Sequence, residues 1–163
     1  MKEENIKTVK DSSIQLTQQM TQADANLAGY VHGGSVMKII DNTAGIVATR
    51  HVRSANVVTA SIDRLEFHSP VRVGDLLRVK ASINHIGNTS MEIGVRVEAE
   101  DFITGEVRHT GSAYLTFVAL DENRNMIPVP PIIFETDDEK RRNAEAMERR
   151  KYRLAKLGKA QKN

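Results

Sequence analysis

The sequence contains no cysteine among its 163 residues. A disulfide framework, a thiolate metal site and a catalytic thiol are therefore excluded together. The sequence also lacks any run of about 18 apolar residues that could span a bilayer, and its first residues, MKEENIKTVKDSS, contain no apolar block typical of signal peptides. We expect a protein without membrane insertion that stays in the cytoplasm, with chemistry carried by oxygen, nitrogen or backbone groups.

Several familiar site motifs are missing as well. No GxSxG motif marks a catalytic serine. Neither GxxxxGK[ST] nor a strand-linked GxGxxG occurs, which excludes the common phosphate-binding loops. The five histidines show no HxH or HxxxH pairing and no carboxylate at ligand spacing, so we expect no metal site.

Basic charge is concentrated at the C-terminal end. The formal net charge is +2, but residues 137–163 contain ten Lys and Arg against five Asp and Glu, so the rest of the chain is net negative. Tyr152 is the one aromatic residue of that segment, which offers little for stacking on nucleic-acid bases. We predict an exposed, partly frayed helix over 136–157 and no nucleic-acid partner. A non-enzymatic ligand-sensing or RNA-binding module that uses this basic segment stays an alternative.

Hydrophobic and polar residues alternate from Asn56 to Leu120, which is typical of strands with one buried face. Two of these strands form a predicted antiparallel hairpin around a turn at 87–89. The last one is apolar on both faces toward its end, which is typical of a central strand. The predicted strands are 14–20, 58–67, 77–83, 91–99 and 107–120.

The strand expected over 58–67 contains a change of phase. Its apolar face is predicted to carry Val58, Ala60, Ile62, Leu65 and Phe67. The spacing changes between the third and the fourth of these residues, which predicts a bulge near Asp63 and Arg64.

One helix is predicted in the body of the chain, from Gly34 to Val52. Its apolar residues cover most of its circumference, so we expect it to be buried on several sides. Together with about five antiparallel strands, this helix predicts an α+β fold in which a curved sheet wraps around one central helix. The prolines that follow end the sheet, because proline cannot join a ladder. The predicted organisation is an N-terminal tail (1–11), one domain (12–135) and a basic C-terminal helical tail (136–163).

The segment that precedes and opens this helix contains the strongest candidates for chemistry. Gly33 and Gly34 leave backbone amides at the helix start that can bind an oxyanion, or they simply make a tight turn. Asp41 is either a carboxylate in a cleft, able to take a proton from water, or a solvent-facing residue. Asn26 can hold a carbonyl or a water, or it can close an Asx-turn.

The segment from Asp24 to Gly45, DANLAGYVHGGSVMKIIDNTAG, resembles the opening of hot-dog-fold acyl-CoA thioesterases of the acyl-CoA hydrolase family. The resemblance continues in DRLEF, PVRVGD, GNTSME, SAYLTFVALD and IPVP, and it covers roughly residues 12 to 135. It implies a hot-dog fold and hydrolysis of acyl-CoA to a free acid and coenzyme A. The implied reaction has no cofactor, since coenzyme A is part of the substrate.

The resemblance also implies roles for particular residues. In family members with two fused hot-dog domains, an Asn of one domain and an Asp of the central helix of the other share catalysis, and the matching residues are Asn26 and Asp41. Asp41 would act as general base or as nucleophile, and Asn26 would come from the partner subunit. A homodimer is therefore expected as the catalytic unit, and a trimer of dimers as the complete assembly.

Contacts to coenzyme A are expected at the turn formed by Gly87, Asn88, Thr89 and Ser90, whose amides and hydroxyls suit phosphate, although a plain hairpin turn fits these residues equally well. Arg64 and Arg142 could each neutralise a phosphate or be a surface charge. A rival enzyme class is a hot-dog dehydratase or hydratase acting on acyl thioesters, which would pair His32 with Asp41.

Overall fold

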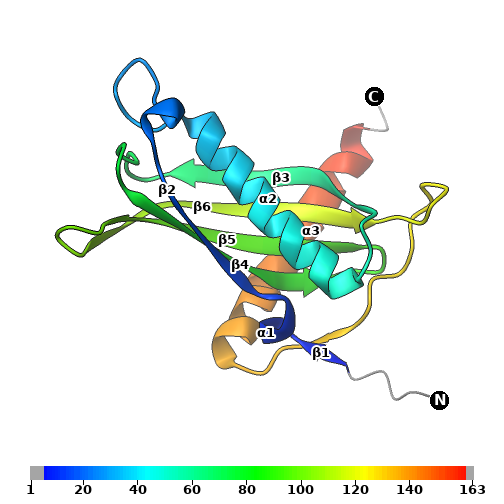
Figure 1. Ribbon diagram of the computed structural model, residues 1–163. Helices are drawn as coiled ribbons and strands as arrows, with labels where there is room; N and C mark the ends of the chain where they lie inside the picture. Colours follow the sequence, from blue (N-terminus) through cyan, green and yellow to red (C-terminus); the bar gives the residue numbers. More distant parts are fainter. Residues whose placement is uncertain (1–5, 161–163) are drawn as a thin grey trace.

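The computed structural model describes residues 6–160, with side chains up to residue 158. Its main feature is a five-stranded antiparallel sheet with the strand order β2-β4-β5-β6-β3 (Figure 1). The strands are β2 (Ile14–Gln19), β3 (Val57–Phe67), β4 (Leu76–Ile86), β5 (Ser90–Asp101) and β6 (Glu106–Ala119). The five predicted strands are therefore confirmed. β6 has neighbours on both sides, as its two apolar faces predicted.

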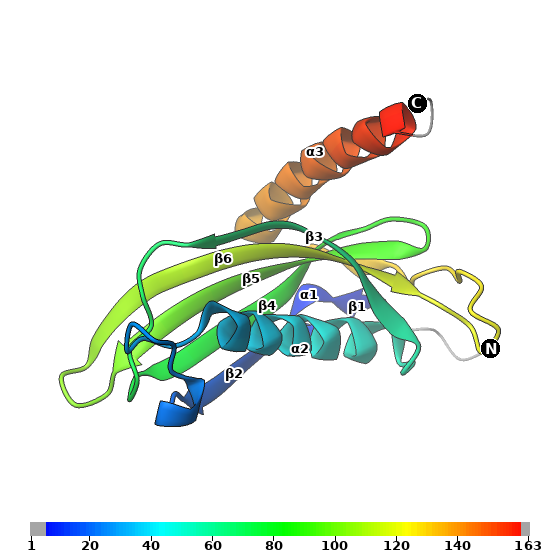
Figure 2. The same ribbon diagram turned by 90° about the horizontal axis from the view of Figure 1, so that it is seen from above.

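The helix α2 (Gly33–Val52) packs against one face of this sheet, which curves around it (Figure 2). Alternate residues of β4, from Leu77 to Ile83, point toward α2 and are at most 3% exposed. The predicted α+β class, with one central helix, is confirmed. The predicted burial of α2 on several sides is not found within a single chain, because Met37 and Ile46 are 40% and 38% exposed.

β3 contains two irregularities in its pairing with β6 rather than one. The register shifts between Thr59 and Ser61 and again between Ile62 and Arg64. The second shift confirms the bulge predicted near Asp63, and the first was not predicted. Because each bulge adds one residue to the strand, the predicted inward phase of Val58 is wrong: Val58 is 46% exposed.

Short helices and strands occur before, between and after the strands of the large sheet in the sequence. β1 (Lys7–Thr8) pairs in parallel with β7 (Ile132–Ile133), so the prolines end the large sheet but a separate two-stranded sheet follows them. α1 (Val9–Ser12) comes next after β1, and η1 (Gln22–Asp24) lies between β2 and α2. Lys7 Nζ donates to the carbonyl oxygen of Arg50, 3.1 Å away, at the end of α2. Residues 1–5 and 161–163 of the expected tails lie outside the described residues.

The helix α3 (Asp137–Ala160) crosses the outer face of the sheet, opposite α2 (Figure 2). Ala146 is 0% exposed. Arg149 Nη2 donates to Glu92 Oε1 on β5 over 2.7 Å, and its guanidinium lies 3.8 Å from the centre of the Tyr114 ring. The predicted C-terminal helix is confirmed, and most of its residues are exposed. Its docking on the sheet through one face was not predicted, because the partners of that face are distant in the sequence.

Candidate functional site

Asp41 lies on α2, about two turns after its first residue, and is partly buried. Its Oδ1 atom accepts a hydrogen bond of 2.7 Å from the Oγ1 hydroxyl of Thr59 on β3. Its Oδ2 atom has no hydrogen-bond partner within residues 6–160. One oxygen therefore fixes the carboxylate, and the other is free to accept a proton.

Thr59 is a residue of this site that the sequence analysis missed. The predicted alternation put Val58 and Ala60 on the inner face of β3 and Thr59 on the outer face. The unpredicted shift between Thr59 and Ser61 reverses this assignment, and Thr59 faces α2. The only signal in the sequence was a polar residue between apolar neighbours, which is too common in strands to mark a site.

Asn26 lies in the loop between β2 and α2. Its Oδ1 accepts hydrogen bonds from the backbone N–H groups of Ala28 (2.9 Å) and Tyr30 (3.2 Å), so it closes an Asx-type turn. Its Nδ2 donates to no residue in the part of the chain that the structure describes. The side chain can therefore hold its own loop through the oxygen and still donate to a ligand through the nitrogen.

The two glycines at the start of α2 differ in what their amides can do. The Gly34 N–H donates to Nδ1 of His32, the N-cap residue, over 2.9 Å. The next two amides of the helix donate to the His32 carbonyl oxygen. Within residues 6–160 the Gly33 N–H has no such partner, so it is the amide of this turn that remains available to an oxyanion.

A cavity of about 360 Å³ opens beside this turn. Asn26 and Gly33 line it together with Tyr30, Phe67 and His68. The Phe67 ring lies against Gly33, where an added Cβ would be 3.7 Å from the ring. The structure thus brings Asn26 and Gly33 to one hollow with aromatic and apolar walls.

Asp41 does not line that cavity. Asp41 is eight positions after Gly33 along a continuous helix, and a rise of about 1.5 Å per position puts them about 12 Å apart along the helix axis. Hydrogen bonds span about 3 Å between heavy atoms. One protomer therefore does not bring the Asp41 carboxylate together with the Asn26 loop.

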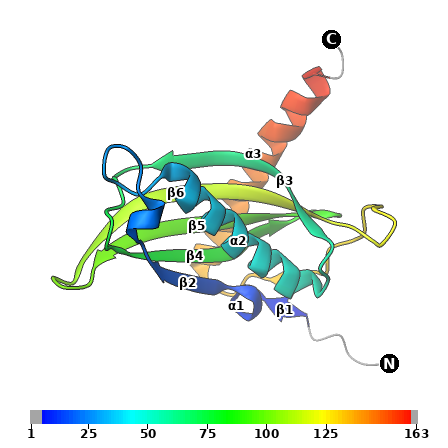
Figure 3. The ribbon, with the colours of Figure 1, turned by 45° about the horizontal axis from the view of Figure 1, so that its top comes forward.

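The residues expected to contact coenzyme A lie elsewhere. The turn from Gly87 to Ser90 is at the end of the sheet where α2 ends, far from the start of α2 (Figure 3). It is closed by a hydrogen bond of 2.7 Å from the Gly87 N–H to the Ser90 carbonyl oxygen. Asn88 is exposed, and the Thr89 hydroxyl contacts the Met126 sulfur at 3.7 Å.

Arg64 lies on the outer face of β3, opposite Tyr114 of β6, and its side chain is 61% exposed. Its Nη2 donates to Glu66 Oε1 over 2.6 Å. This hydrogen bond lowers the pKa of the Glu66 carboxyl below its ordinary value. Arg64 is thus paired within the chain and lies on the opposite face of β3 from Thr59.

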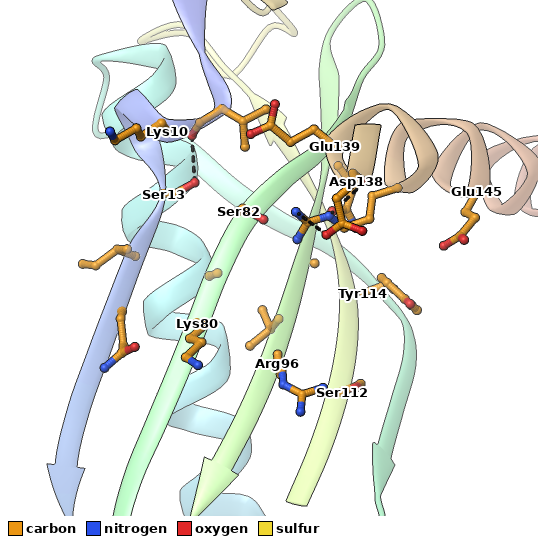
Figure 4. A pocket seen from close by; sticks show the side chains of 18 of the residues that line it. Lys10, Ser13, Lys80, Ser82, Arg96, Ser112, Tyr114, Asp138, Glu139 and Glu145 are labelled. Atoms are coloured by element: carbon orange, nitrogen blue, oxygen red, sulfur yellow. Dashed lines mark hydrogen bonds and ion pairs between the residues drawn. The ribbon is translucent and has the colours of Figure 1, made fainter. Parts of the chain in front are cut away.

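A second cavity, of about 880 Å³, lies on the outer face between β2, β4, β5 and the first turns of α3 (Figure 4). Lys80 and Arg96 on its floor both pair with Glu98, and Asp138 and Glu145 on α3 face it from the side. The sheet separates this cavity from Asp41. Residues 6–160 include no group of three or more His, Asp or Glu that could hold a metal ion, and no helix among them is long and apolar enough to cross a membrane.

A model of the thioesterase superfamily matches residues 28–106. The human cytosolic acyl coenzyme A thioester hydrolase is 39% identical over 137 residues, which are 83% of this chain and 36% of the human protein. The chain thus spans about a third of the length of that relative. A Bacillus subtilis protein named as an uncharacterized acyl-CoA thioester hydrolase is 37% identical over 130 residues, 80% of this chain and 75% of the relative.

Solved structures with the same fold align with nearly the whole of this chain. An apo hexameric acyl-CoA thioesterase has a TM-score of 0.88 at 39% identity and covers 92% of this chain and 96% of its own. An acyl-CoA hydrolase from Staphylococcus aureus, solved with butyryl coenzyme A, coenzyme A and coenzyme A disulfide, has a TM-score of 0.88 at 32% identity over 96% of this chain and 95% of its own. The resemblance in the sequence is confirmed: this chain belongs to the acyl-CoA thioester hydrolase family of the thioesterase superfamily and has the hot-dog fold.

Proposed function

We propose that this protein hydrolyses acyl-CoA thioesters to a free carboxylic acid and coenzyme A. The observation that carries the proposal is the Asp41 carboxylate, which the Thr59 hydroxyl holds at 2.7 Å through one oxygen while the other is free. The Staphylococcus aureus hydrolase has also been solved as variants in which an aspartate, an asparagine and a threonine are replaced by alanine. Asp41, Asn26 and Thr59 are the same three residue types.

In the proposed reaction, Asp41 Oδ2 takes a proton from a water molecule while the water oxygen attacks the thioester carbonyl carbon. The free Gly33 N–H stabilises the resulting oxyanion, a contribution of about 3 kcal/mol. The Gly34 N–H adds to it only when the His32 ring releases it. Asn26 Nδ2 donates to the water or to the carbonyl oxygen. The C–S bond then breaks, and the leaving thiolate takes the proton from Asp41.

We further propose that Asn26 and Gly33 of one subunit act with Asp41 of another, because about 12 Å separates Gly33 from Asp41 in one helix. The two edges of the sheet suggest how two copies meet. The β2 edge exposes Gln and Thr side chains, whereas the β3 edge exposes Val58 (46%) and Ile62 (41%). An apolar edge strand is stabilised by pairing with another strand. Pairing along β3 would also lie beside Met37 of α2.

We propose a homodimer as the catalytic unit and a trimer of dimers as the complete assembly. The solved relatives include hexameric thioesterases, with the one described above at 39% identity and one from Yersinia pestis at 28%. We assign the protein to the cytoplasm from the name of its human relative. The proposed reaction consumes only water and the thioester, so no cofactor is assigned.

For coenzyme A, we propose the turn from Gly87 to Ser90, with Arg64 as a separate candidate for neutralising a phosphate. Replacement of Asn88 and Thr89 by alanine should raise KM for an acyl-CoA ester and leave KM unchanged for a short thioester without the nucleotide. An equal rise with both substrates would contradict this contact. Arg142, the other candidate for neutralising a phosphate, pairs with Asp138 on α3.

The hydrolase assignment is tested by Asp41→Ala, with release of free thiol measured on acetyl-CoA to palmitoyl-CoA. We expect kcat to fall by about 100-fold or more, since general-base catalysis contributes that much. Asn42→Ala is the matched control, because Asn42 is the exposed next residue of the same helix. Near wild-type turnover of Asp41→Ala on every chain length would overturn the assignment. Hydration of an enoyl thioester without thiol release would instead identify a hydratase.

A further inference from the structure

β3 is the strand that presents Thr59 to Asp41. Two of its residues have no paired residue on β6. These are Ala60, between the paired residues Thr59 and Ser61, and Asp63, between Ile62 and Arg64. A bulge bends a strand and changes the direction in which its side chains point. The position of the Thr59 hydroxyl therefore depends on how firmly this pair of bulges is held.

The Asp63 carboxylate connects the two bulges to β6 and to α3. Asp63 Oδ1 accepts a hydrogen bond from the Ser61 hydroxyl (2.9 Å), directly after the first bulge. Asp63 Oδ2 accepts one from the Thr116 hydroxyl of β6 (3.2 Å) and forms an ion pair with Arg153 of α3. The side chains of Asp63 and Arg153 are only 18% and 19% exposed. Solvent therefore screens this pair less than it screens an exposed one.

We infer that Arg153 is a positioning residue for the proposed hydrolysis. By holding Asp63 it fixes the bulged segment of β3, and the fixed segment keeps the Thr59 hydroxyl 2.7 Å from Asp41. Arg153 touches neither Asp41 nor Thr59, and it acts from the opposite face of the sheet. This inference rests on the proposed function for its effect on turnover, but not for its effect on β3.

A matched control lies one helical turn away. Arg149 is on the same face of α3 and forms an equally specific ion pair, with Glu92, which is 3% exposed. Glu92 belongs to β5, and β6 separates β5 from β3. Loss of Arg149 therefore weakens the docking of α3 and removes its contact with the Tyr114 ring, but it removes no contact to Ala60 or Asp63.

The experiment compares Arg153→Gln with Arg149→Gln in the full chain. Arg153→Gln should lower kcat about tenfold with KM unchanged, a size typical of residues that act through a connected network. Arg149→Gln should leave kcat within about twofold of wild type, while lowering the unfolding midpoint in urea at least as much. Arg153→Lys keeps the charge and should recover part of the loss. An equal loss of kcat in both glutamine variants would overturn the inference.

A double variant tests whether Arg153 acts through Thr59. Once Thr59→Val has removed the hydroxyl, adding Arg153→Gln should lower kcat no further. Two losses that multiply would show that Arg153 acts by another route and would overturn the inference.

Amide hydrogen exchange in residues 59–63 provides a readout that needs no activity. It should become faster in Arg153→Gln and stay at the wild-type rate in Arg149→Gln. Unchanged exchange in Arg153→Gln would refute the inference even in an active thioesterase. If the wild-type chain hydrolysed no thioester, the proposed function would fail, and exchange alone would still decide the role of Arg153.

Discussion

Protomers that carry Asn26→Ala and protomers that carry Asp41→Ala should each be inactive alone and regain activity when mixed. The reason is the separation of about 12 Å between Gly33 and Asp41 in one helix, which leaves the Asn26 loop and the Asp41 carboxylate of one subunit in different places. In a two-fold dimer, a heterodimer of these variants has one site with both residues intact and one site with neither.

The expected activity follows from counting sites. With random pairing of equal amounts, about half of the dimers are heterodimers, each with one intact site of two, so the mixture should reach about one quarter of the wild-type site concentration. The assay is thiol release after subunits have been exchanged by co-refolding, with heterodimers verified by native mass spectrometry. No recovered activity in verified heterodimers would refute the shared site.

A mirrored mixture provides the control. Wild-type protomers are mixed with the double variant Asn26→Ala, Asp41→Ala. A shared site leaves activity only in wild-type homodimers, about one quarter of the wild-type site concentration, whereas a site within one subunit leaves about half. The two mixtures must agree, because both depend on the same assignment of residues to subunits.

Further predictions concern the hydroxyl at Asp41, the docking of α3 and the dependence of stability on pH. Thr59→Val removes the hydrogen bond to Asp41 at constant shape; since bonds to charged groups contribute about 1.5 kcal/mol or more, kcat should fall about tenfold, and an unchanged kcat would show that the working enzyme does not use this bond. Arg149→Ala leaves the Glu92 carboxylate buried without its cation and should lower the free energy of unfolding in urea by about 3 kcal/mol; a loss below about 0.5 kcal/mol would contradict this reading of the ion pair. Burial lowers the pKa of His51 below its ordinary 6.5, so the unfolded state binds a proton at His51 more readily than the folded state does. The contribution of His51 to the free energy of unfolding should therefore be present above about pH 6.5 and decrease as the pH falls below it. This pH dependence should be absent in His51→Gln. Hydrogen bonds from Arg96 and Lys80 lower the pKa of Glu98 to about 2. The contribution of Glu98 to the free energy of unfolding should therefore be complete above its ordinary pKa of 4.5 and be lost as the pH falls toward 2. If Glu98→Gln lost stability in acid in the same way as the wild type, this prediction would be wrong.

The sequence alone was sufficient for those parts of the protein whose information is local. Alternation of apolar and polar residues predicted the hairpin of β4 and β5, because side chains of a strand point to opposite faces at a fixed period. A long apolar stretch after two glycines predicted α2 within one residue of its start. Asn26, Gly33 and Asp41 stood out because they belong to one continuous segment.

Only the tertiary structure decided the direction of Thr59 and the place of α3. A bulge at Ala60 reverses the inward face of β3, and its position depends on pairing with β6, more than fifty residues later in the chain. Arg149 and Arg153 resembled solvated charges in the sequence, because their partners are 57 and 90 residues away. Strand pairing and ion pairs between distant segments depend on the folded backbone, which brings these groups into contact, and no local period of the sequence records them.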